Sequence, residues 1–374
     1  MSTSTAPTAA SRPIFLAEFG ELGGAERCCL ALADWLHARE VPCHLVTYRN
    51  PANIEQFAKY PLEVVELKPE MHVRKKIAAL RAYFQSRPAG APQILTNGYQ
   101  DVLHATLAGL RGFHTLMHDT PALFGNASGE KTLKERARLW TSNRIIAHGL
   151  KSGGRTFVNS EFLRDDSRRD FGIEAEIVRM GGMGDPRDFT LRPVAGQLNM
   201  LSVSRVENNK RIDWMLRSLA ALEHATQPLS RRVDWQLHIA GKGSQIEALQ
   251  TMAIELGLGE RTHFHGFVSD AQLEELYRQA HLFLMPAVQG YGIPAIESLQ
   301  RGIPILLHRQ SGVSDILLAT PWATVLYGGE ETMTAKLAEA IQGVMEGRQL
   351  AVPLPVLPTE AAWAEQIAER CGWL

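Results

Sequence analysis

Residues 285–306, MPAVQGYGIPAIESLQRGIPIL, decide the fold class. An apolar run leads into a turn that holds Gly290 and Gly292, and a helix follows from about Pro294, because proline favours the first turn of a helix. A second apolar run, IPIL, comes directly after that helix. A strand, a turn, a helix and another strand form a βαβ unit, so the stretch predicts a parallel sheet covered by helices.

The same rhythm runs through the rest of the chain and restarts once, after the segment LRPVAGQ at residues 191–197. We therefore predict an α/β protein with two doubly wound, Rossmann-like domains that face each other across a ligand-binding cleft. The polar, small-residue start predicts a disordered tail. The expected parts are a tail at 1–12, an N-terminal domain at 13–194, a C-terminal domain at 195–357 and a final helix at 358–374.

The bulk composition narrows the functional classes. The 374 residues carry a net charge of −1, so the global charge identifies no partner, and we expect no nucleic-acid partner. The chain has neither a signal-peptide start nor a run near the ~20 apolar residues of a membrane span, so we expect a cytoplasmic protein. Its four cysteines lack metal-ligand spacing and are expected to be reduced thiols.

In the second domain, several expected strands end in residues suited to a phosphorylated ligand. Arg205 and Lys210 lie between a strand and a helix, where two cations could hold a diphosphate or remain solvated at the surface. Gly241 follows another expected strand, at the same edge of the sheet. Gly266 and Phe267 follow a third, where backbone groups could contact the edge of a nucleobase or form an ordinary capped loop.

The opening stretch completes this set. Gly290, Tyr291 and Gly292 can present backbone N–H groups beside the positive end of the next helix. We place Glu297 in the first turn of that helix. A carboxylate there either complements the helix dipole or accepts the two hydroxyls of a ribose.

Two features of the first domain carry weaker signals. Gly23 and Gly24 join a strand to a helix, which suits either an anion at the helix N-terminus or a turn with positive φ. The spacing is not G-x-G-x-x-G, which disfavours a dinucleotide oxidoreductase. His118 ends a strand, where it is either structural or placed to hold a sugar hydroxyl or the reacting centre.

In this order the motifs resemble those of the retaining GT-B glycosyltransferases, the large family that contains sucrose synthase and many bacterial mannosyl- and glucosyltransferases. The resemblance covers most of the chain and rests on "GGAE" at 23–26, Arg205 with Lys210, "GKG" at 241–243, "FHG" at 264–266 and the stretch at 286–304. It implies a GT-B fold whose final helix, containing Trp363, crosses back to the N-terminal domain.

The resemblance also implies a role for each residue. Arg205 and Lys210 would hold the nucleotide diphosphate, and Glu297 would bind the ribose. His118 would lie beside the donor sugar and its anomeric carbon. The remaining implied donor contacts are made largely by backbone groups: Gly23, Gly24, Gly241, Gly266, Phe267, Gly290, Tyr291 and Gly292.

Two departures from the family pattern stand out. Gln289 occupies a position where the family usually has a Glu that faces donor-sugar hydroxyls, and an amide lacks that charge. We still assign Gln289 to the catalytic group with His118, Arg205 and Lys210. The segment at 181–189, GGMGDPRDF, replaces a shorter turn.

These observations favour a retaining hexosyltransferase that moves a sugar from a UDP- or GDP-sugar to a glycan or lipid-linked acceptor, in surface polysaccharide biosynthesis. No D-x-D motif is evident, so we expect no metal and no other cofactor. A nucleotide-sugar epimerase and a non-catalytic nucleotide-sugar-binding protein remain alternatives. The basic amphipathic segment 72–84 and the basic stretch 130–155 also suggest peripheral contact with an anionic membrane.

Overall fold

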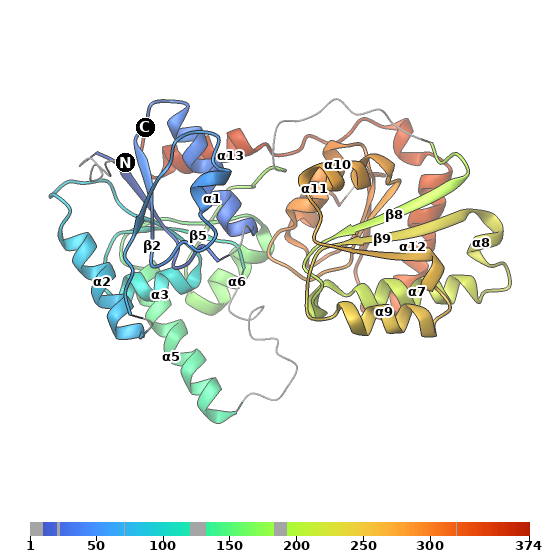
Figure 1. The fold of residues 1–374 in the computed structure, drawn as a ribbon, viewed down its shortest axis with the longest axis horizontal. Coiled ribbons are helices and arrows are strands. Elements are labelled where there is room, and N and C mark those ends of the chain that lie inside the picture. Colours follow the sequence, from blue (N-terminus) through green and yellow to red (C-terminus); the bar gives the residue numbers. More distant parts are fainter. Residues whose placement is uncertain (1–9, 21–22, 71, 120–131, 183–192, 319) are drawn as a thin grey trace. The chain divides into compact units, whose positions relative to one another are not determined.

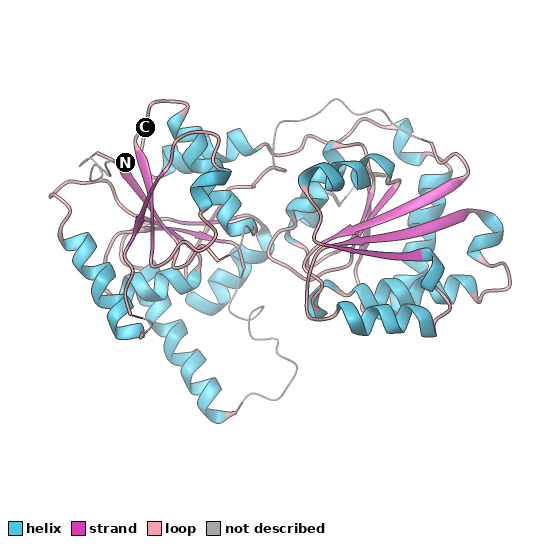
Figure 2. Cartoon of the chain, viewed as in Figure 1, coloured by secondary structure: helices cyan, strands magenta, loops and turns pink. Residues whose placement is uncertain are grey.

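The computed structural model describes residues 10–20, 23–70, 72–119, 132–182, 193–318 and 320–374. The chain divides into two compact units: unit 1 is Met1–Met180 with Glu360–Leu374, and unit 2 is Gly181–Thr359. In each unit helices flank a parallel β-sheet (Figures 1 and 2). The prediction of two Rossmann-like α/β domains is confirmed.

The sheet of unit 1 has the order β3-β2-β1-β4-β5-β6-β7. Its described strands are β1 (Arg12–Phe15), β2 (Cys43–Thr47), β3 (Glu63–Glu66), β4 (Leu95–Asn97), β5 (His114–Met117), β6 (Thr156–Val158) and β7 (Glu176–Ile177). The described helices of this unit are α1 (Gly24–His37), α2 (Val73–Gln85), α3 (Tyr99–Leu107), α5 (Leu133–Leu150), α6 (Glu161–Phe171) and α13 (Glu360–Arg370), with the 3-10 helix η1 (Ile54–Phe57).

The sheet of unit 2 has the order β10-β9-β8-β11-β12-β13. Its strands are β8 (Gln197–Val203), β9 (Asp234–Ala240), β10 (Thr262–Gly266), β11 (Leu282–Met285), β12 (Ile305–His308) and β13 (Ala323–Leu326). The described helices are α7 (Ile212–Glu223), α8 (Leu229–Arg232), α9 (Ile246–Glu255), α10 (Asp270–Gln279), α11 (Ile293–Gln300) and α12 (Glu330–Met345), with η2 (Asn208–Lys210), η3 (Gly259–Arg261), η4 (Gly312–Ile316) and η5 (Arg348–Ala351).

Burial explains why the central strands were recognisable from the sequence. Every residue of β5, β11 and β12 is buried, because helices cover both faces of a parallel sheet. Such strands are continuous apolar runs. The two edge strands that the sequence analysis missed differ: β3 reads Glu-Val-Val-Glu and is only partly buried, and β7 has two residues.

The order of strands creates a switch point in each sheet. In unit 2 the chain runs outward from β8 to β9 and β10, and then returns to the other side of β8 with β11. Helices on the two sides of such a point leave a crevice at the carboxyl ends of the strands. The corresponding point in unit 1 lies between β1 and β4.

The last helix belongs to unit 1 and packs against α1. Trp363 is 1% exposed and Ile367 is fully buried on its inner face. After the helix, the carbonyl oxygen of Trp373 accepts a hydrogen bond of 2.8 Å from Arg12 Nη2, so the end of the described chain is tied to the start of β1.

Several predicted boundaries differ from the structure. The described structure begins before Pro13, since Ser11 is 3% exposed and Arg12 starts β1, whereas residues 1–9 lie outside the described residues. The units divide after Met180 rather than after residue 194. Gly182 pairs with Thr359 in unit 2, and most of the unusual 181–189 segment lies outside the described residues.

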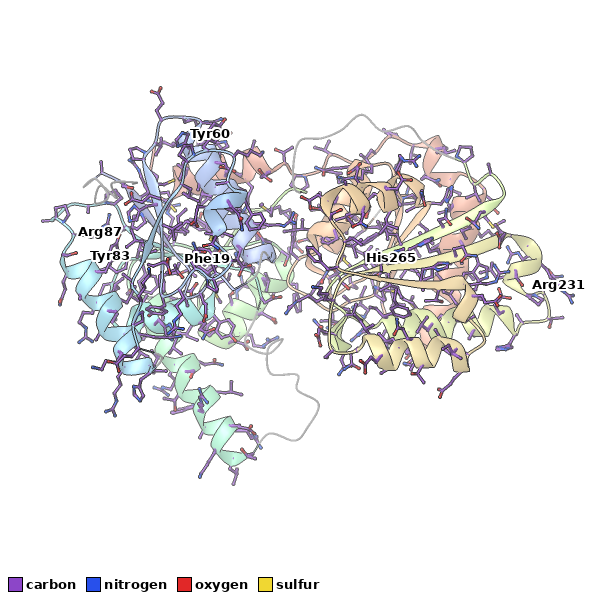
Figure 3. All side chains as sticks on the ribbon, in the orientation of Figure 1. Phe19, Tyr60, Tyr83, Arg87, Arg231 and His265 are labelled. Atoms are coloured by element: carbon purple, nitrogen blue, oxygen red, sulfur yellow. The ribbon has the colours of Figure 1, made fainter. Side chains whose placement is uncertain are left out.

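The amphipathic segment 72–84 is largely part of the core. Leu80 of α2 is fully buried, and Ile77 and Phe84 pack against the hydrophobic cluster of unit 1. Tyr83, on the same helix, is labelled in Figure 3. Its hydroxyl oxygen lies 2.5 Å from His44 Nε2. The apolar face of α2 therefore stabilises unit 1, which leaves mainly Val73 and the neighbouring cations at the surface.

None of the helices in the described ranges is both long enough and apolar enough to cross a membrane.

The packing of α13 predicts the effect of removing its largest buried side chain. Trp363→Ala should lower the free energy of unfolding by about 3–5 kcal/mol, because it leaves a cavity under the helix. Glu369→Ala, at an exposed position of the same helix, should change it by less than about 0.5 kcal/mol. Urea unfolding of both variants measures this difference, and equal stability would show that the packing of α13 contributes little.

Candidate functional site

The switch point of unit 2 brings together two of the predicted site residues. Lys210 ends η2, which follows β8, and Gln289 lies in the loop after β11. Lys210 Nζ donates a hydrogen bond of 2.5 Å to Gln289 Oε1. Residues 79 positions apart in the sequence thus meet at the carboxyl ends of two neighbouring strands, where a cation and the loop before α11 suit a phosphorylated ligand.

Gln289 is held on its other side as well. Its Nε2 lies 2.9 Å from Met285 Sδ and 3.4 Å from Ser311 Oγ. The backbone reinforces this arrangement, since Gly312 N donates to Gln289 O at 3.2 Å. Because the amide nitrogen faces these groups, the amide oxygen faces Lys210, and this partner of the cation is neutral.

The turn after Gln289 requires glycine. Gly292 has a φ of 123°, and a Cβ atom there would lie 2.7 Å from Met285 Cε. It caps α11, so the N-terminus of that helix follows the turn directly. The Tyr291 side chain is 5% exposed, and its carbonyl oxygen accepts hydrogen bonds from Ser311 Oγ at 2.9 Å and Val313 N at 3.2 Å.

The segment after β8 is supported by the turn after β9. A Cβ atom on Gly241, whose φ is 139°, would lie 1.8 Å from the backbone oxygen of Ser204. Val206 N also donates to Lys242 O at 2.8 Å. The close approach of two backbone segments therefore explains why residue 241 is glycine. The same contact positions the exposed Arg205 at the carboxyl edge of the sheet, which we call the rim.

The loop after β10 joins the same rim. Gly241 N donates to Gly266 O at 2.7 Å, so that carbonyl already has a partner within the protein. Phe267 is 75% exposed, and Lys242 Nζ lies 5.0 Å from the centre of its ring. An exposed aromatic ring beside a cation offers a surface on which a planar group can stack.

Glu297 lies in the second turn of α11 rather than the first, because the helix starts at Ile293. The prediction of a first-turn position was wrong, and dipole complementation at the N-terminus is therefore a weak explanation for this carboxylate. Glu297 Oε2 accepts a hydrogen bond of 3.0 Å from the buried Tyr277 hydroxyl. Burial, and then the Glu297 charge, raise the pKa of Tyr277, so its hydroxyl stays a donor.

In unit 1, His118 belongs to a polar network at three adjacent strand ends. Its Nε2 lies 2.6 Å from Asn97 Oδ1 at the end of β4, and its Nδ1 lies 3.4 Å from Asn159 Nδ2 after β6. Burial lowers the pKa of His118 to about 4, so the ring is neutral near pH 7. Both ring nitrogens thus have partners within the protein.

The Gly23–Gly24 turn is capped by the protein itself. Gly23 is the N-cap of α1, and its backbone N–H donates to Glu26 Oε2 at 3.1 Å. An anion that binds this N–H would first have to displace the carboxylate. Gly23 itself has a φ of −97°, so the expectation of a turn with positive φ is wrong.

Sequence reasoning missed four residues that position the predicted ones: Asn97, Asn159, Tyr277 and Ser311. Asn97 and Asn159 had a detectable signal, because each is a polar residue at the end of an apolar run. Tyr277 and Ser311 had none, since their contacts with Glu297 and Gln289 arise only from the packing of α10 and the loop after β12.

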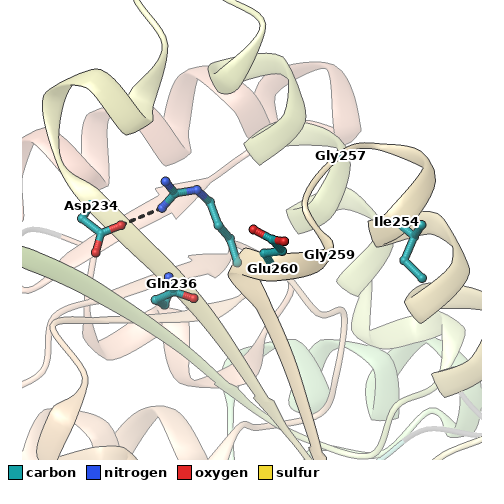
Figure 4. Close-up of a pocket in the computed structure, with 7 residues that line it drawn as sticks. Asp234, Gln236, Ile254, Gly257, Gly259 and Glu260 are labelled. Atoms are coloured by element: carbon teal, nitrogen blue, oxygen red, sulfur yellow. Dashed lines mark hydrogen bonds and ion pairs between the residues drawn. The ribbon is translucent and has the colours of Figure 1, made fainter.

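A pocket of about 620 Å³ lies elsewhere in unit 2 (Figure 4). Asp234, at the start of β9, and Arg261, just before β10, line it and form an ion pair of 2.8 Å. It therefore lies at the amino ends of strands whose carboxyl ends carry the predicted donor residues. His265, labelled in Figure 3, forms a hydrogen bond of 3.0 Å with His238. Within the described ranges, no group of three or more His, Cys, Asp and Glu side chains could hold a metal ion.

Comparison with known families agrees with this geometry. The family described as "Glycosyl transferases group 1" matches residues 188–352, and "Glycosyltransferase Family 4" matches residues 22–180. The two matches divide the chain as the two units do. Residues 188–352 belong to the group 1 glycosyltransferases. The prediction of a glycosyltransferase of GT-B type is thereby confirmed at the level of the family.

The curated proteins that match the chain are distant relatives. The alpha-monoglucosyldiacylglycerol synthase of Streptococcus pneumoniae is 22% identical over 79% of this chain and 62% of its own length. The GDP-mannose-dependent alpha-(1-6)-phosphatidylinositol monomannoside mannosyltransferase of Mycolicibacterium smegmatis is 31% identical over 39% of this chain and 36% of its own. The chain spans between about a third and three fifths of the length of these two relatives.

Solved structures of glycosyltransferases share the fold across nearly the whole chain. Anabaena HepE in complex with UDP has a TM-score of 0.73 at 16% identity, over 97% of this chain and 100% of its own. WaaG, described as a glycosyltransferase involved in lipopolysaccharide biosynthesis, has a TM-score of 0.69 at 17% identity, over 96% and 95%.

The contact between Lys210 and Gln289 predicts the result of restoring the residue that the family usually has. Gln289→Glu should form an ion pair with Lys210 and withdraw part of its charge from a bound diphosphate. We expect the Kd for nucleoside diphosphate to rise about tenfold. Isothermal titration calorimetry measures this, with Gln279→Glu at an exposed site on α10 as the charge control. Equal affinity in all three proteins would contradict the inferred role of position 289.

Proposed function

We propose that the protein is a hexosyltransferase that uses a UDP- or GDP-sugar as donor, retains the anomeric configuration and needs no metal. The observation that carries this proposal is the Lys210–Gln289 hydrogen bond at the switch point of unit 2, directly before the glycine turn that caps α11. In a group 1 glycosyltransferase, this arrangement supports binding of a nucleoside diphosphate whose charge is met by Lys210, Arg205 and backbone N–H groups.

The proposed reaction follows from the charge that develops in it. The bond between the anomeric carbon and the diphosphate oxygen breaks, and the bonding electrons leave with the nucleoside diphosphate. The acceptor hydroxyl oxygen bonds to the same face of that carbon, and its proton passes to the departing phosphate oxygen. Lys210 and Arg205 stabilise the negative charge on the leaving group, which is the main electrostatic demand of the step.

The Glu297 and Phe267 contacts support the nucleoside part of the proposal. Glu297, oriented by Tyr277, would accept the ribose hydroxyls, and exposed Phe267 would flank the base. The relatives support either base, because HepE was solved with UDP and the mycobacterial relative is named for GDP-mannose. The acceptor would be a glycan or a lipid-linked sugar.

Lys210→Ala tests the reaction. We expect kcat/KM for donor to fall about 100-fold or more, because a cation that stabilises the transition state is lost. Lys336→Ala, which breaks only an exposed ion pair on α12, should leave it unchanged. Nucleotide release from UDP- and GDP-sugars measures this.

The other outcomes separate the alternatives. Nucleotide binding by a wild-type protein that releases nucleotide from no sugar donor would support a binding protein. Interconversion of the donor sugar without transfer would support an epimerase. Wild-type turnover in Lys210→Ala would contradict the assignment of Lys210.

We also propose that unit 1 makes peripheral contact with an anionic membrane through the first half of α5. Leu133 is 83% exposed and Trp140 is 62% exposed on this segment, and the exposed cations Lys134, Arg136 and Arg138 lie around them. In Figure 1 this half of α5 extends away from the rest of unit 1. Exposed apolar and basic side chains together suit an interface of acidic lipid. Such contact would place the enzyme at the inner face of the membrane, in the cytoplasm.

Vesicle co-sedimentation tests this contact. Wild-type protein should bind phosphatidylcholine vesicles that contain phosphatidylglycerol, bind less as salt increases, and not bind phosphatidylcholine alone. Reversing the charges of Arg136 and Arg138 to Glu should weaken the partition by at least about tenfold. The same reversal at exposed Arg231 and Arg232 on α8 is the control. Salt-insensitive binding, or equal loss in both double variants, would contradict the proposed surface.

A further inference from the structure

The network around His118 assigns a protonation state to its ring. Asn97 Nδ2 donates a hydrogen bond of 2.8 Å to the carbonyl oxygen of Ala25 in the first turn of α1. This contact fixes which end of the Asn97 amide faces His118, because only the nitrogen can donate to a carbonyl. The oxygen then lies 2.6 Å from His118 Nε2, so Nε2 must carry the hydrogen.

The other ring nitrogen has a different status. In the Nε2–H tautomer, Nδ1 carries a lone pair and accepts from Asn159 Nδ2 over 3.4 Å, which is near the limit for a hydrogen bond. Protonation of Nδ1 would set two N–H donors against each other. The geometry and the burial of the ring therefore favour the same neutral state.

The three residues occupy equivalent places in the sheet. Asn97 is the last residue of β4, His118 follows β5 directly, and Asn159 follows β6 directly, and these three strands are neighbours. Asn97 is 2% exposed and Asn159 is 6% exposed, while His118 is only partly buried. The histidine is thus the member of the network that a ligand at the carboxyl edge can reach.

We propose that Asn97 is a positioning residue that locks His118 as the neutral Nε2–H tautomer, so that Nδ1 accepts a hydrogen bond from a substrate hydroxyl in place of the long bond from Asn159. This inference rests on the proposed glycosyltransferase function. It makes His118 a hydrogen-bond acceptor rather than an acid, a base or a cation. A substrate whose hydroxyl is removed or methylated at that position would lose the contact.

The ionisable groups on the elements around this network need to be considered in any pH test. They are Glu26 in α1, Tyr99 and Asp101 in α3, and Asp119, which follows His118. Burial raises the pKa of Asp101 to about 8, so this carboxyl is mostly protonated at neutral pH. Asp101 loses most of its remaining charge between pH 8 and pH 7, in wild-type protein as well, so a change near pH 6 has to come from another group.

The first measurement uses wild-type protein. The ring-nitrogen chemical shifts of His118, assigned by comparison with His118→Gln, should report the Nε2–H tautomer and no protonation down to about pH 5. An Nδ1–H tautomer, or titration near the ordinary histidine pKa of about 6.5, would overturn the inference.

The second measurement replaces the residue proposed to fix the His118 tautomer. Asn97→Asp places a carboxylate against Nε2–H, which should raise the pKa of His118 and turn Nδ1 into a donor as the pH falls. The donor KM of this variant should rise about tenfold between pH 8 and pH 6, as expected for the loss of one substrate hydrogen bond. The wild-type protein should change less than about twofold. Asn53→Asp adds the same charge elsewhere in unit 1 and is the matched control.

The two measurements separate this inference from the proposed function. Active wild-type enzyme whose KM has the same pH dependence as that of a folded Asn97→Asp variant would overturn the inference alone. Wild-type protein that shows the Nε2–H tautomer but turns over no sugar donor would overturn the proposed function, and the substrate contact with it. If Asn97→Asp does not fold, the tautomer measured in wild-type protein still tests whether His118 is held in the Nε2–H state.

Discussion

Parallel pairing of β8 with β9 and with β11 is the constraint on which the candidate site depends. Each strand carries a different segment to the same edge of the sheet. Arg205 and Lys210 arrive after β8, the Gly241 turn after β9, and Gln289 after β11. Because all the strands are parallel, their carboxyl ends lie at the same edge of the sheet. The strand order changes direction at β8, since β9 and β10 lie on one side of it and β11 lies on the other. Without that pairing, Lys210 and Gln289 have no reason to meet.

Close backbone packing then converts this edge into a defined rim. The Gly241 turn approaches Ser204 so closely that no side chain fits between them, and Val206 is tied to Lys242. Glycine at position 241 is thus needed for the packing of the protein itself, whether or not it also contacts a ligand. Gly23 differs, because its φ is −97° and its N–H is bonded to the Glu26 carboxylate. The Gly241 and Gly292 turns are explained by backbone geometry, and any ligand contact is added to that role.

At the carboxyl edge of each sheet, one candidate site side chain is hydrogen-bonded to a neutral amide side chain. Lys210 donates a hydrogen bond to the neutral amide oxygen of Gln289. His118 lies between two asparagines, and burial keeps it uncharged. An amide can orient a neighbouring group without changing its charge, whereas an acid would do both. Position 289 and position 97 each hold an amide against an ionisable side chain.

The sequence by itself determined the α/β class, the two Rossmann-like units and the family, because buried parallel strands are continuous apolar runs and the glycine and cation motifs keep their order along the chain. It placed Glu297 one turn too early and missed β3, whose glutamates interrupt the apolar pattern. Only the tertiary structure decided which residues meet: Lys210 with Gln289, Tyr277 with Glu297, and Asn97 with His118. These pairs lie 79, 20 and 21 residues apart, and no local pattern encodes a hydrogen bond that forms only after separate strands and helices have packed.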